Sequence, residues 1–241
     1  MEVNISVYLT HLKTRAKNCF AIFAKRRQLT NHLVNFLAYF CLFLCKPKAD
    51  SANAMLTLRK FIENYVSLPD DEWTIISQAF ERNEFRKNEF LLEEGSVCRY
   101  FYFIESGLVR FFLLNNDGDE VTKFFTTAPY CFTAKDSFRN QTPARESIQA
   151  LDRTIVWQTT LQQSNDLLAL KSWSDFTRKF VHEVQSYTEE LLMESKTETA
   201  EIRYRKLQEK YPELIQKIPL KHLSSFLGIA PQSLSRIRKK S

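Results

Sequence analysis

Residues 219–240 read PLKHLSSFLGIAPQSLSRIRKK, a pattern typical of two short helices joined by a tight turn. Gly228 suits the turn, because glycine leaves a helix through a left-handed conformation at the least cost. Pro231 suits the first turn of the second helix, where its missing N–H is not needed. The apolar residues fall where two such helices must pack together, at Leu223, Leu227, Ile229, Leu234 and Ile237. Ser224 is small enough to let the helices approach, so the stretch predicts a helix-turn-helix that starts at Leu220.

Polar and basic side chains dominate the outward face of the second predicted helix. They are Gln232, Ser233, Ser235, Arg236 and Lys239, with Lys240 next to them at the end. Residues 214–241 contain no Asp or Glu, and such a one-sided positive charge favours phosphate contact. Arg and Gln side chains also match base edges in the major groove. The pattern predicts double-stranded DNA as a partner, with Lys239 and Lys240 on phosphate. The alternative is a helical hairpin that only packs within an α-helical domain.

The composition allows one large or two modest domains in 241 residues, and 44% hydrophobic residues are ample for a packed core. The net charge of +6 arises from 34 Lys+Arg and 28 Asp+Glu. Residues 1–54 hold eight of those basic and two of those acidic residues, which accounts for the whole excess. The rest balances at 26 against 26, so the basic C-terminus belongs to an otherwise neutral body.

Residues 1–54 differ in texture from the rest of the chain. The apolar run 33–45 is shorter than the about 20 residues that a membrane-spanning helix needs. The run imitates a signal peptide, but charged residues from Lys46 onward crowd the cleavage site. Helix caps and periodicity become orderly only from Met55. We therefore expect the native protein to begin at Met55 and residues 1–54 to be a non-native or poorly ordered extension. An accessory or membrane-associating helix is the second interpretation.

The chain lacks the sequence signatures of common enzyme classes. Its five cysteines are irregularly spaced, which indicates reduced thiols in a cytoplasmic protein rather than a disulfide framework. The four histidines lie outside the β-rich middle of the chain, so a His-ligated metal site of a barrel enzyme is not expected. No nucleophile elbow or glycine-rich phosphate loop occurs either. We expect no enzyme activity, no catalytic residue, no metal and no cofactor.

Residues 85–156 are rich in Phe, Tyr, Val and Ile and are broken at short intervals by turn residues. Such punctuation is typical of an antiparallel sandwich or barrel. The tetrapeptide 116–119, Asn-Asp-Gly-Asp, predicts a hairpin between two apolar runs. The predicted fold class is α+β: an antiparallel β-roll or jelly-roll sensor domain, a long dimerisation helix and a C-terminal helical domain with the helix-turn-helix.

The run 88–125, NEFLLEEGSVCRYFYFIESGLVRFFLLNNDGDEVTKFF, followed by a helical segment and the C-terminal stretch, resembles the Crp/Fnr superfamily of bacterial transcription regulators. The resemblance covers residues 55–241. It implies a cyclic-nucleotide-binding-like β-roll at 55–160, a dimerisation helix region at 161–197 and a DNA-binding domain at 198–241. It further implies a homodimer on a near-palindromic operator, with RNA polymerase as a further candidate partner.

In that family a Gly-Glu pair and a downstream Arg hold the cyclic phosphate and the ribose. Here Thr133, Ala134 and Lys135 stand where the pair is expected, and the arginine position falls on Ala144. Arg145 is one place off, so its side chain should face the other way along a strand. The roll is thus expected to be a degenerate module whose effector is unknown and is not cyclic AMP. Arg145 stays open as a phosphate ligand.

Apolar residues recur at steps of three and four between the roll and the C-terminal stretch, as in the seam of a coiled coil. They are Trp173, Phe176, Phe180, Val184, Tyr187 and Leu191. The resemblance identifies this segment as the dimerisation helix, and all of these residues except Trp173 are expected at the dimer interface. A second apolar face at Val181 and Leu192 can then pack on the chain's own roll. The other interpretation is a helix that packs only on its own roll.

Together these features predict a homodimeric, sequence-specific transcription regulator in the cytoplasm. Recognition helices of the family begin with Arg-Glu and carry a later Arg, positions that become Pro231, Gln232 and Arg236 here. Only the last matches, so we expect a different operator. Two alternatives of other classes stay open: a small-molecule-binding module whose helical tail mediates protein contacts, and a membrane-associated adaptor that uses residues 20–45.

Overall fold

The structure is a computed structural model, and it describes residues 51–240. They belong to a compact unit that spans residues 49–241. The predictions for the first 50 residues, including the apolar run 33–45, lie outside the described residues. Within residues 51–240, no helix is both long and apolar enough to cross a membrane.

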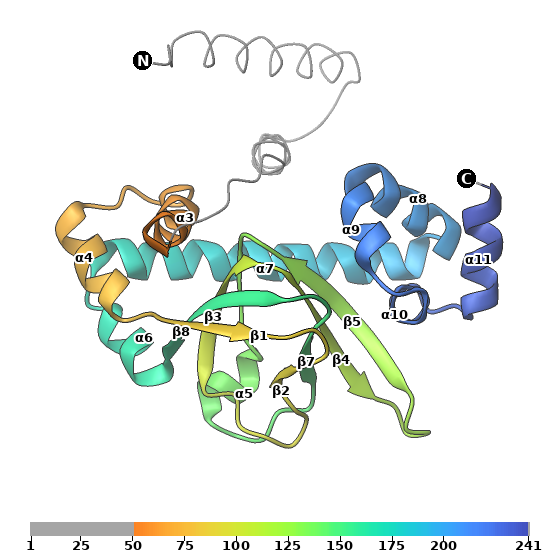
Figure 1. The fold of residues 1–241 in the computed structure, drawn as a ribbon, viewed down its shortest axis with the longest axis horizontal. Helices are drawn as coiled ribbons and strands as arrows, with labels where there is room; N and C mark the ends of the chain where they lie inside the picture. The colour runs from red at the N-terminus through yellow and green to blue at the C-terminus, as the bar shows by residue number, and fades with distance from the viewer. Residues whose placement is uncertain (1–50, 241) are drawn as a thin grey trace, which may run out of the picture. The chain divides into compact units, whose positions relative to one another are not determined.

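Within the described residues, helices α3 and α4 precede the β-rich region (Figure 1). Helix α3 (Ser51–Glu63) buries Phe61 against the roll, and α4 (Asp70–Gln78) begins with three acidic residues, which favour a helix N-terminus. Arg59 joins the two helices, because it donates hydrogen bonds to Glu63 at 2.9 Å and to Asp70 at 2.6 Å.

The β-rich region folds into two four-stranded antiparallel sheets, and the predicted α+β fold class is confirmed. The first sheet has the order β1-β8-β3-β6, with bounds Glu81–Phe85, Thr154–Thr160, Tyr100–Ser106 and Tyr130–Phe132. The second has the order β2-β7-β4-β5, with bounds Phe90–Leu92, Ser147–Ala150, Leu108–Leu114 and Glu120–Thr127. The predicted hairpin joins β4 to β5, and Asn115 Oδ1 closes its turn by accepting the backbone N–H groups of Asp117 and Asp119.

Aromatic side chains fill much of the space between the two sheets. Phe111 of β4 stacks on Phe124 of β5 with ring centroids 4.1 Å apart, and Tyr102 of β3 stacks on Phe132 at 5.1 Å. Helix α5 (Lys135–Asn140) adds Phe138 to the same cluster. Buried rings of this size dominate core energetics, so the interior of the roll is largely occupied by its own side chains.

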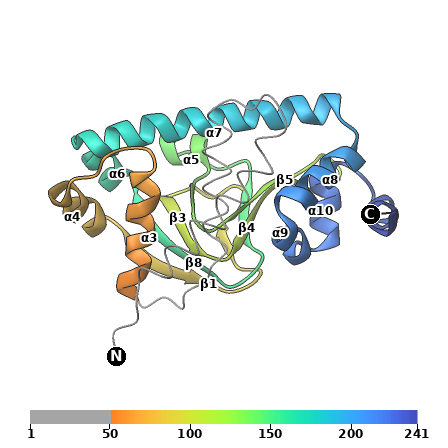
Figure 2. The same cartoon turned by 90° about the horizontal axis from the view of Figure 1, so that it is seen from above.

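Helix α6 (Leu161–Leu167) begins with a capping box made by Thr160 and Gln163. Helix α7 (Lys171–Thr197) comes next and runs past the sheets toward the C-terminal helices (Figure 2). β8 ends at Thr160 and α7 ends at Thr197, the two positions of the predicted domain boundaries. The division into domains stays a prediction.

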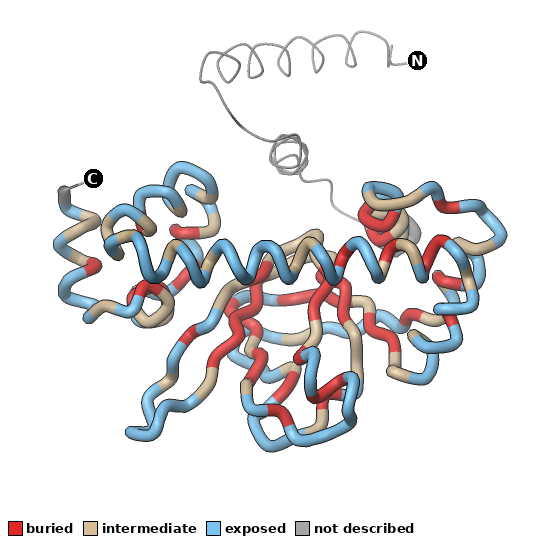
Figure 3. Tube along the Cα trace, turned by 180° about the vertical axis from the view of Figure 1, so that it is seen from behind, coloured by how far each residue is buried: buried red, intermediate tan, exposed pale blue. Residues whose placement is uncertain are grey.

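The predicted dimer seam needs a correction at its N-terminal end. Phe176 and Phe180 are buried in their own chain, where both rings pack on Phe61 of α3 with centroids 6.1 and 5.9 Å away. The prediction assigned these two rings to the dimer interface. The apolar period marks the face of the helix that is covered, but it does not say which molecule covers that face. The exposed side chains of α7 include Val181 and Leu192, which were expected on the chain's own roll. Figure 3 shows the long exposed stretches of α7.

Four short helices complete the chain: α8 (Ala200–Lys210), α9 (Pro212–Lys217), α10 (Leu220–Leu227) and α11 (Pro231–Lys240). Their buried apolar residues form one cluster, which includes Tyr204, Leu223 and Leu234. Leu108 and Leu151 of the roll belong to the same cluster. The C-terminal helices therefore share a core with the roll.

Candidate nucleic-acid interface

The two helices predicted from the C-terminal stretch form as α10 and α11. Gly228 ends α10 in the left-handed conformation at φ 70°, where the absence of a Cβ removes the steric cost. Ile229 N–H donates to the Ser224 carbonyl at 3.0 Å, which closes the turn. Ser224, Leu223 and Leu234 are buried, as the spacing predicted.

The outward face of α11 carries the predicted DNA-contacting side chains. Gln232, Ser233, Arg236 and Lys239 are exposed, and Ser235 is half-buried. Lys240 is the last residue of α11, and its side chain lies outside the described part. The structure thus places four of the six predicted residues on one solvent-facing surface. Their contact with DNA stays a prediction.

Two arginines that the sequence interpretation missed support this helix pair. The Arg203 side chain of α8 donates to the Leu227 carbonyl at 2.6 Å, at the end of α10 where carbonyls lack helical partners. The guanidinium of Arg238 lies 5.9 Å from the Tyr204 ring centroid, within the range of a cation–π contact. Arg238 is half-buried, so it belongs to the packing of the domain rather than to the outward face.

Helix α10 docks on β5, an edge strand of the second sheet. Ser225 Oγ donates to the Glu120 carbonyl and accepts the N–H of Thr122, both at 2.9 Å. The Phe226 ring lies 5.6 Å from that of Phe125. The hydroxyl therefore satisfies backbone groups that an edge strand otherwise leaves unpaired, and it ties the roll to the first helix of the pair.

A buried arginine of the roll forms the centre of the same interface. Arg110 of β4 is 2% exposed, and its Nε and Nη2 donate to Gln149 Oε1 at 2.9 and 2.7 Å. Its Nη2 lies 2.8 Å from Glu120 Oε2, and its Nη1 lies 2.8 Å from Nδ1 of His222 in α10. Because Arg can only donate, His222 Nδ1 is the acceptor and the ring proton sits on Nε2. The guanidinium also lies 3.9 Å from the Phe112 ring centroid.

The charged groups in this network shift one another's pKa values. Burial lowers the pKa of His222, and the positive charge of Arg110 lowers it further, to about 4. Burial works to raise the pKa of Glu120, but Arg110 and Lys221 outweigh it and hold that pKa below its usual value. At neutral pH the cluster therefore contains a charged arginine, a carboxylate and a neutral imidazole. The sequence signal that could have indicated this network is the single charged residue, Arg110, in the apolar run LVRFFLL. A cation buried in such a strand must have polar partners.

The predicted effector-pocket residues differ in their surroundings, and their role as a pocket stays a prediction. Thr133 donates from its hydroxyl to the Tyr100 carbonyl at 2.9 Å, and Ala134 is buried in the core of the roll. Lys135 and Arg145 are exposed. Ala144, at the position of the expected arginine, is buried in the same core, whereas Arg145 is exposed in the bend that precedes β7 (Ser147–Ala150) rather than on a strand.

Among the residues that the structure describes, no group of three or more His, Cys, Asp or Glu side chains is placed to hold a metal ion. Cys98 and Cys131 are both buried as free thiols, and burial raises the pKa of Cys131. A buried protonated thiol is a poor nucleophile and a poor metal ligand.

Comparison with known proteins identifies the roll and the fold. Residues 82–170 match the cyclic nucleotide-binding domain family. No curated protein matches the chain. Among solved structures, FixK2 from Bradyrhizobium japonicum superposes with a TM-score of 0.57 at 16% identity, over 67% of this chain and 83% of that one.

Two further structures align over similar lengths. A transcriptional regulator of the Crp/Fnr family from Eubacterium rectale gives a TM-score of 0.57 at 15% identity, over 72% of this chain and 83% of that one. The c-di-GMP responsive global regulator CLP of Xanthomonas campestris gives 0.56 at 11%, over 71% and 91%. The chain thus has a segment that matches the cyclic nucleotide-binding domain family, and it shares the fold of these Crp/Fnr-type structures, which confirms the resemblance found in the sequence at the level of the fold.

Proposed function

We propose that the chain is a sequence-specific DNA-binding transcription regulator that reads the major groove with α11. The observation that carries this proposal is the two-sided character of α11. Leu234 is 0% exposed, whereas Gln232 and Arg236 point to solvent one helical turn apart. Side chains so placed can reach neighbouring base pairs.

The electrostatics of the C-terminal region support DNA over a protein partner. Residues 214–241 carry no carboxylate side chain. The roll carboxylate beside α10, that of Glu120, is compensated by Arg110 and lies 3.9 Å from the Lys221 ammonium. Phosphate groups would therefore meet a positive surface. RNA polymerase stays a candidate partner, and the small-molecule module and the membrane adaptor are not favoured.

We infer that a second copy of the chain covers the exposed side of α7. Val181 is 51% and Leu192 is 53% exposed, and Val184 and Leu191 are half-buried. Exposed apolar side chains along one helix are costly in water unless a partner covers them. The proposed interface keeps Val184, Tyr187 and Leu191 from the predicted seam and replaces its two buried phenylalanines with Val181 and Leu192.

The roll is proposed to bind no cyclic AMP in the family's usual manner. The rings of Phe111 and Phe124, a cross-strand pair of β4 and β5, stack in the core of the roll, and Arg145 is exposed. Calorimetry of the full chain with cyclic AMP should show no binding at micromolar concentration. Tight binding that Arg145→Ala abolishes would reverse this part of the proposal.

Selection of bound sequences from random DNA tests the function directly. The full chain should enrich a near-palindromic site whose half-sites lie about 10–10.5 base pairs apart, as expected for a two-fold dimer. Affinity for that site should fall steeply with added salt, because phosphate binding releases counterions. A chain that enriches no sequence, or whose binding is insensitive to salt, is not such a regulator.

A further inference from the structure

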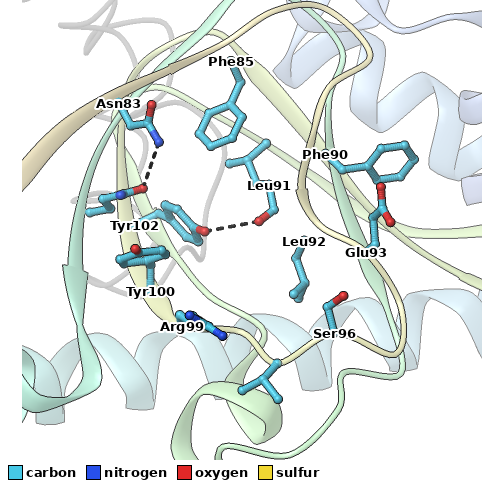
Figure 4. Close-up of a pocket in the computed structure, with 12 residues that line it drawn as sticks. Asn83, Phe85, Phe90, Leu91, Leu92, Glu93, Ser96, Arg99, Tyr100 and Tyr102 are labelled. Atoms are coloured by element: carbon cyan, nitrogen blue, oxygen red, sulfur yellow. Dashed lines mark hydrogen bonds between the residues drawn. The ribbon is translucent and has the colours of Figure 1, made fainter.

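A cavity of about 370 Å³ opens between the two sheets, on the side of β1 and β2 (Figure 4). Its volume lies within the range of small-molecule sites. None of its lining residues comes from residues 130–150, where the family's Gly-Glu pair and arginine are expected, so it is separate from the site at which the family's cyclic nucleotide is expected. The strands β1, β2, β3 and β8 supply most of the lining.

The walls of the cavity combine apolar and aromatic side chains with polar ones. Phe85, Leu91, Leu92, Tyr100 and Tyr102 surround it, and the Tyr102 hydroxyl donates to the Leu91 carbonyl at 3.3 Å, which braces β3 against β2. Figure 4 shows these side chains around one space, whereas the Phe90 ring lies away from Tyr100 and Tyr102. Walls of this kind accept the apolar body of a small molecule.

The side-chain amide of Gln158, which has unused hydrogen-bonding capacity, also lines the cavity. Gln158 of β8 is the cross-strand neighbour of Tyr102, so both side chains face the inside of the roll, and Gln158 is only 7% exposed. Its Oε1 accepts a long hydrogen bond of 3.4 Å from Asn83. Its Nε2 donates to no described residue, although the cavity reaches the side chain. Because it is open to the cavity, this Nε2 is free to donate to an acceptor from outside the chain.

Arg99 contributes a positive charge to the wall of the cavity. Arg99 lines the cavity next to Tyr100, is exposed, and forms no ion pair with the described residues. The other charged lining residue, Glu93, lies beside Phe90 and away from Tyr100 and Tyr102 in Figure 4. A guanidinium favours a carboxylate, which it can bind with two parallel hydrogen bonds.

We propose that this cavity is a binding site for a small amphipathic carboxylate. The acid group binds Arg99, the apolar body lies between Leu91 and the tyrosine rings, and a hydroxyl or carbonyl oxygen accepts from Gln158 Nε2. Such an acid would be the effector of the regulator proposed above, and that consequence alone rests on the proposed function. The binding itself is measured without DNA, so the two proposals can fail separately.

The probe is 4-hydroxybenzoate, which has a carboxylate, an aromatic body and a hydroxyl oxygen. Calorimetry of the full chain should show saturable binding of 4-hydroxybenzoate at millimolar concentration or below. The neutral 4-hydroxybenzamide should bind roughly tenfold more weakly or worse, because a charge-assisted hydrogen bond is lost. The side-chain amide signal of Gln158 in an NMR spectrum should shift on binding.

Three variants locate the site. Arg99→Gln should weaken 4-hydroxybenzoate binding roughly tenfold or more. Arg145→Gln changes another exposed arginine, outside the cavity, and should leave the binding unchanged. Gln158→Leu should weaken 4-hydroxybenzoate binding without unfolding the free chain, because the side chain makes only one long hydrogen bond to the described residues. If Gln158→Leu does not fold, the two arginine variants decide. The proposal is overturned by an absence of saturable binding, by equal binding of the amide, by binding that survives Arg99→Gln, or by loss in Arg145→Gln.

Discussion

Nη1 of Arg110 lies 2.8 Å from Nδ1 of His222, and this contact joins a buried cation of the roll to the first helix of the helix-turn-helix. The two residues are 112 positions apart in the chain. The imidazole accepts from the guanidinium only while it is neutral. This contact between α10 and β4 therefore depends on the protonation state of His222, with Glu120 and Lys221 as the other charged groups nearby.

Stability should fall as the pH drops from about 6.5 to about 4. The pKa of His222 is lowered from 6.5 to about 4 in the folded chain, so between these values the unfolded chain binds more protons. The free energy of unfolding then rises with pH across this window. Above the window the contribution of His222 to stability is complete. Urea unfolding at a series of pH values measures the slope.

A matched pair of variants isolates that histidine. His222→Gln retains an acceptor for Arg110 and should flatten the dependence in this window, whereas His182→Gln on the exposed part of α7 should not. An unchanged slope in His222→Gln would assign the acid sensitivity to other groups.

Arg110→Ala should lower the free energy of unfolding by about 3 kcal/mol, because it leaves the Glu120 carboxylate without its partner in a partly buried site. Lys123→Ala breaks the more exposed pair with Glu146 and should cost at most about 1 kcal/mol. Urea unfolding compares the two. Equal losses would mean that the Arg110 network contributes no more than a surface ion pair.

Arg236→Ala should weaken binding to the selected DNA site by about 1–3 kcal/mol and relax the base preference at one position in each half-site. Lys239→Ala should instead weaken all sequences alike and reduce the salt slope by about one unit. Fluorescence anisotropy at several salt concentrations measures both, with Arg178→Ala on α7 as the control. If Arg236→Ala leaves affinity and preference intact, α11 is not the reading helix.

Leu192→Glu should dissociate the proposed dimer without unfolding the monomer, because Leu192 is exposed in the single chain and a buried pair of like charges is unfavourable at a two-fold axis. Phe180→Ala should instead destabilise the fold of each chain. It should lower the free energy of unfolding by roughly 3–5 kcal/mol, because it leaves a cavity in the chain's own core. Sedimentation equilibrium and circular dichroism distinguish the two outcomes. A dimer that survives Leu192→Glu would place the interface elsewhere.

Short-range causes made much of this fold predictable from the sequence alone. Gly228 and Pro231 mark the turn between α10 and α11, because the backbone conformation at each depends only on neighbouring residues. The tetrapeptide at 116–119 marked the β4–β5 hairpin for the same reason.

Tertiary structure alone decided what each surface meets. The apolar period of α7 was visible, but only packing shows that Phe176 and Phe180 contact Phe61 while Leu192 remains exposed. A period gives the direction of a face, not the molecule that covers it. The contact of Arg110 with His222 and the cavity beside Gln158 arise between strands and helices distant in the chain. Their existence depends on how whole elements pack, which no local pattern encodes.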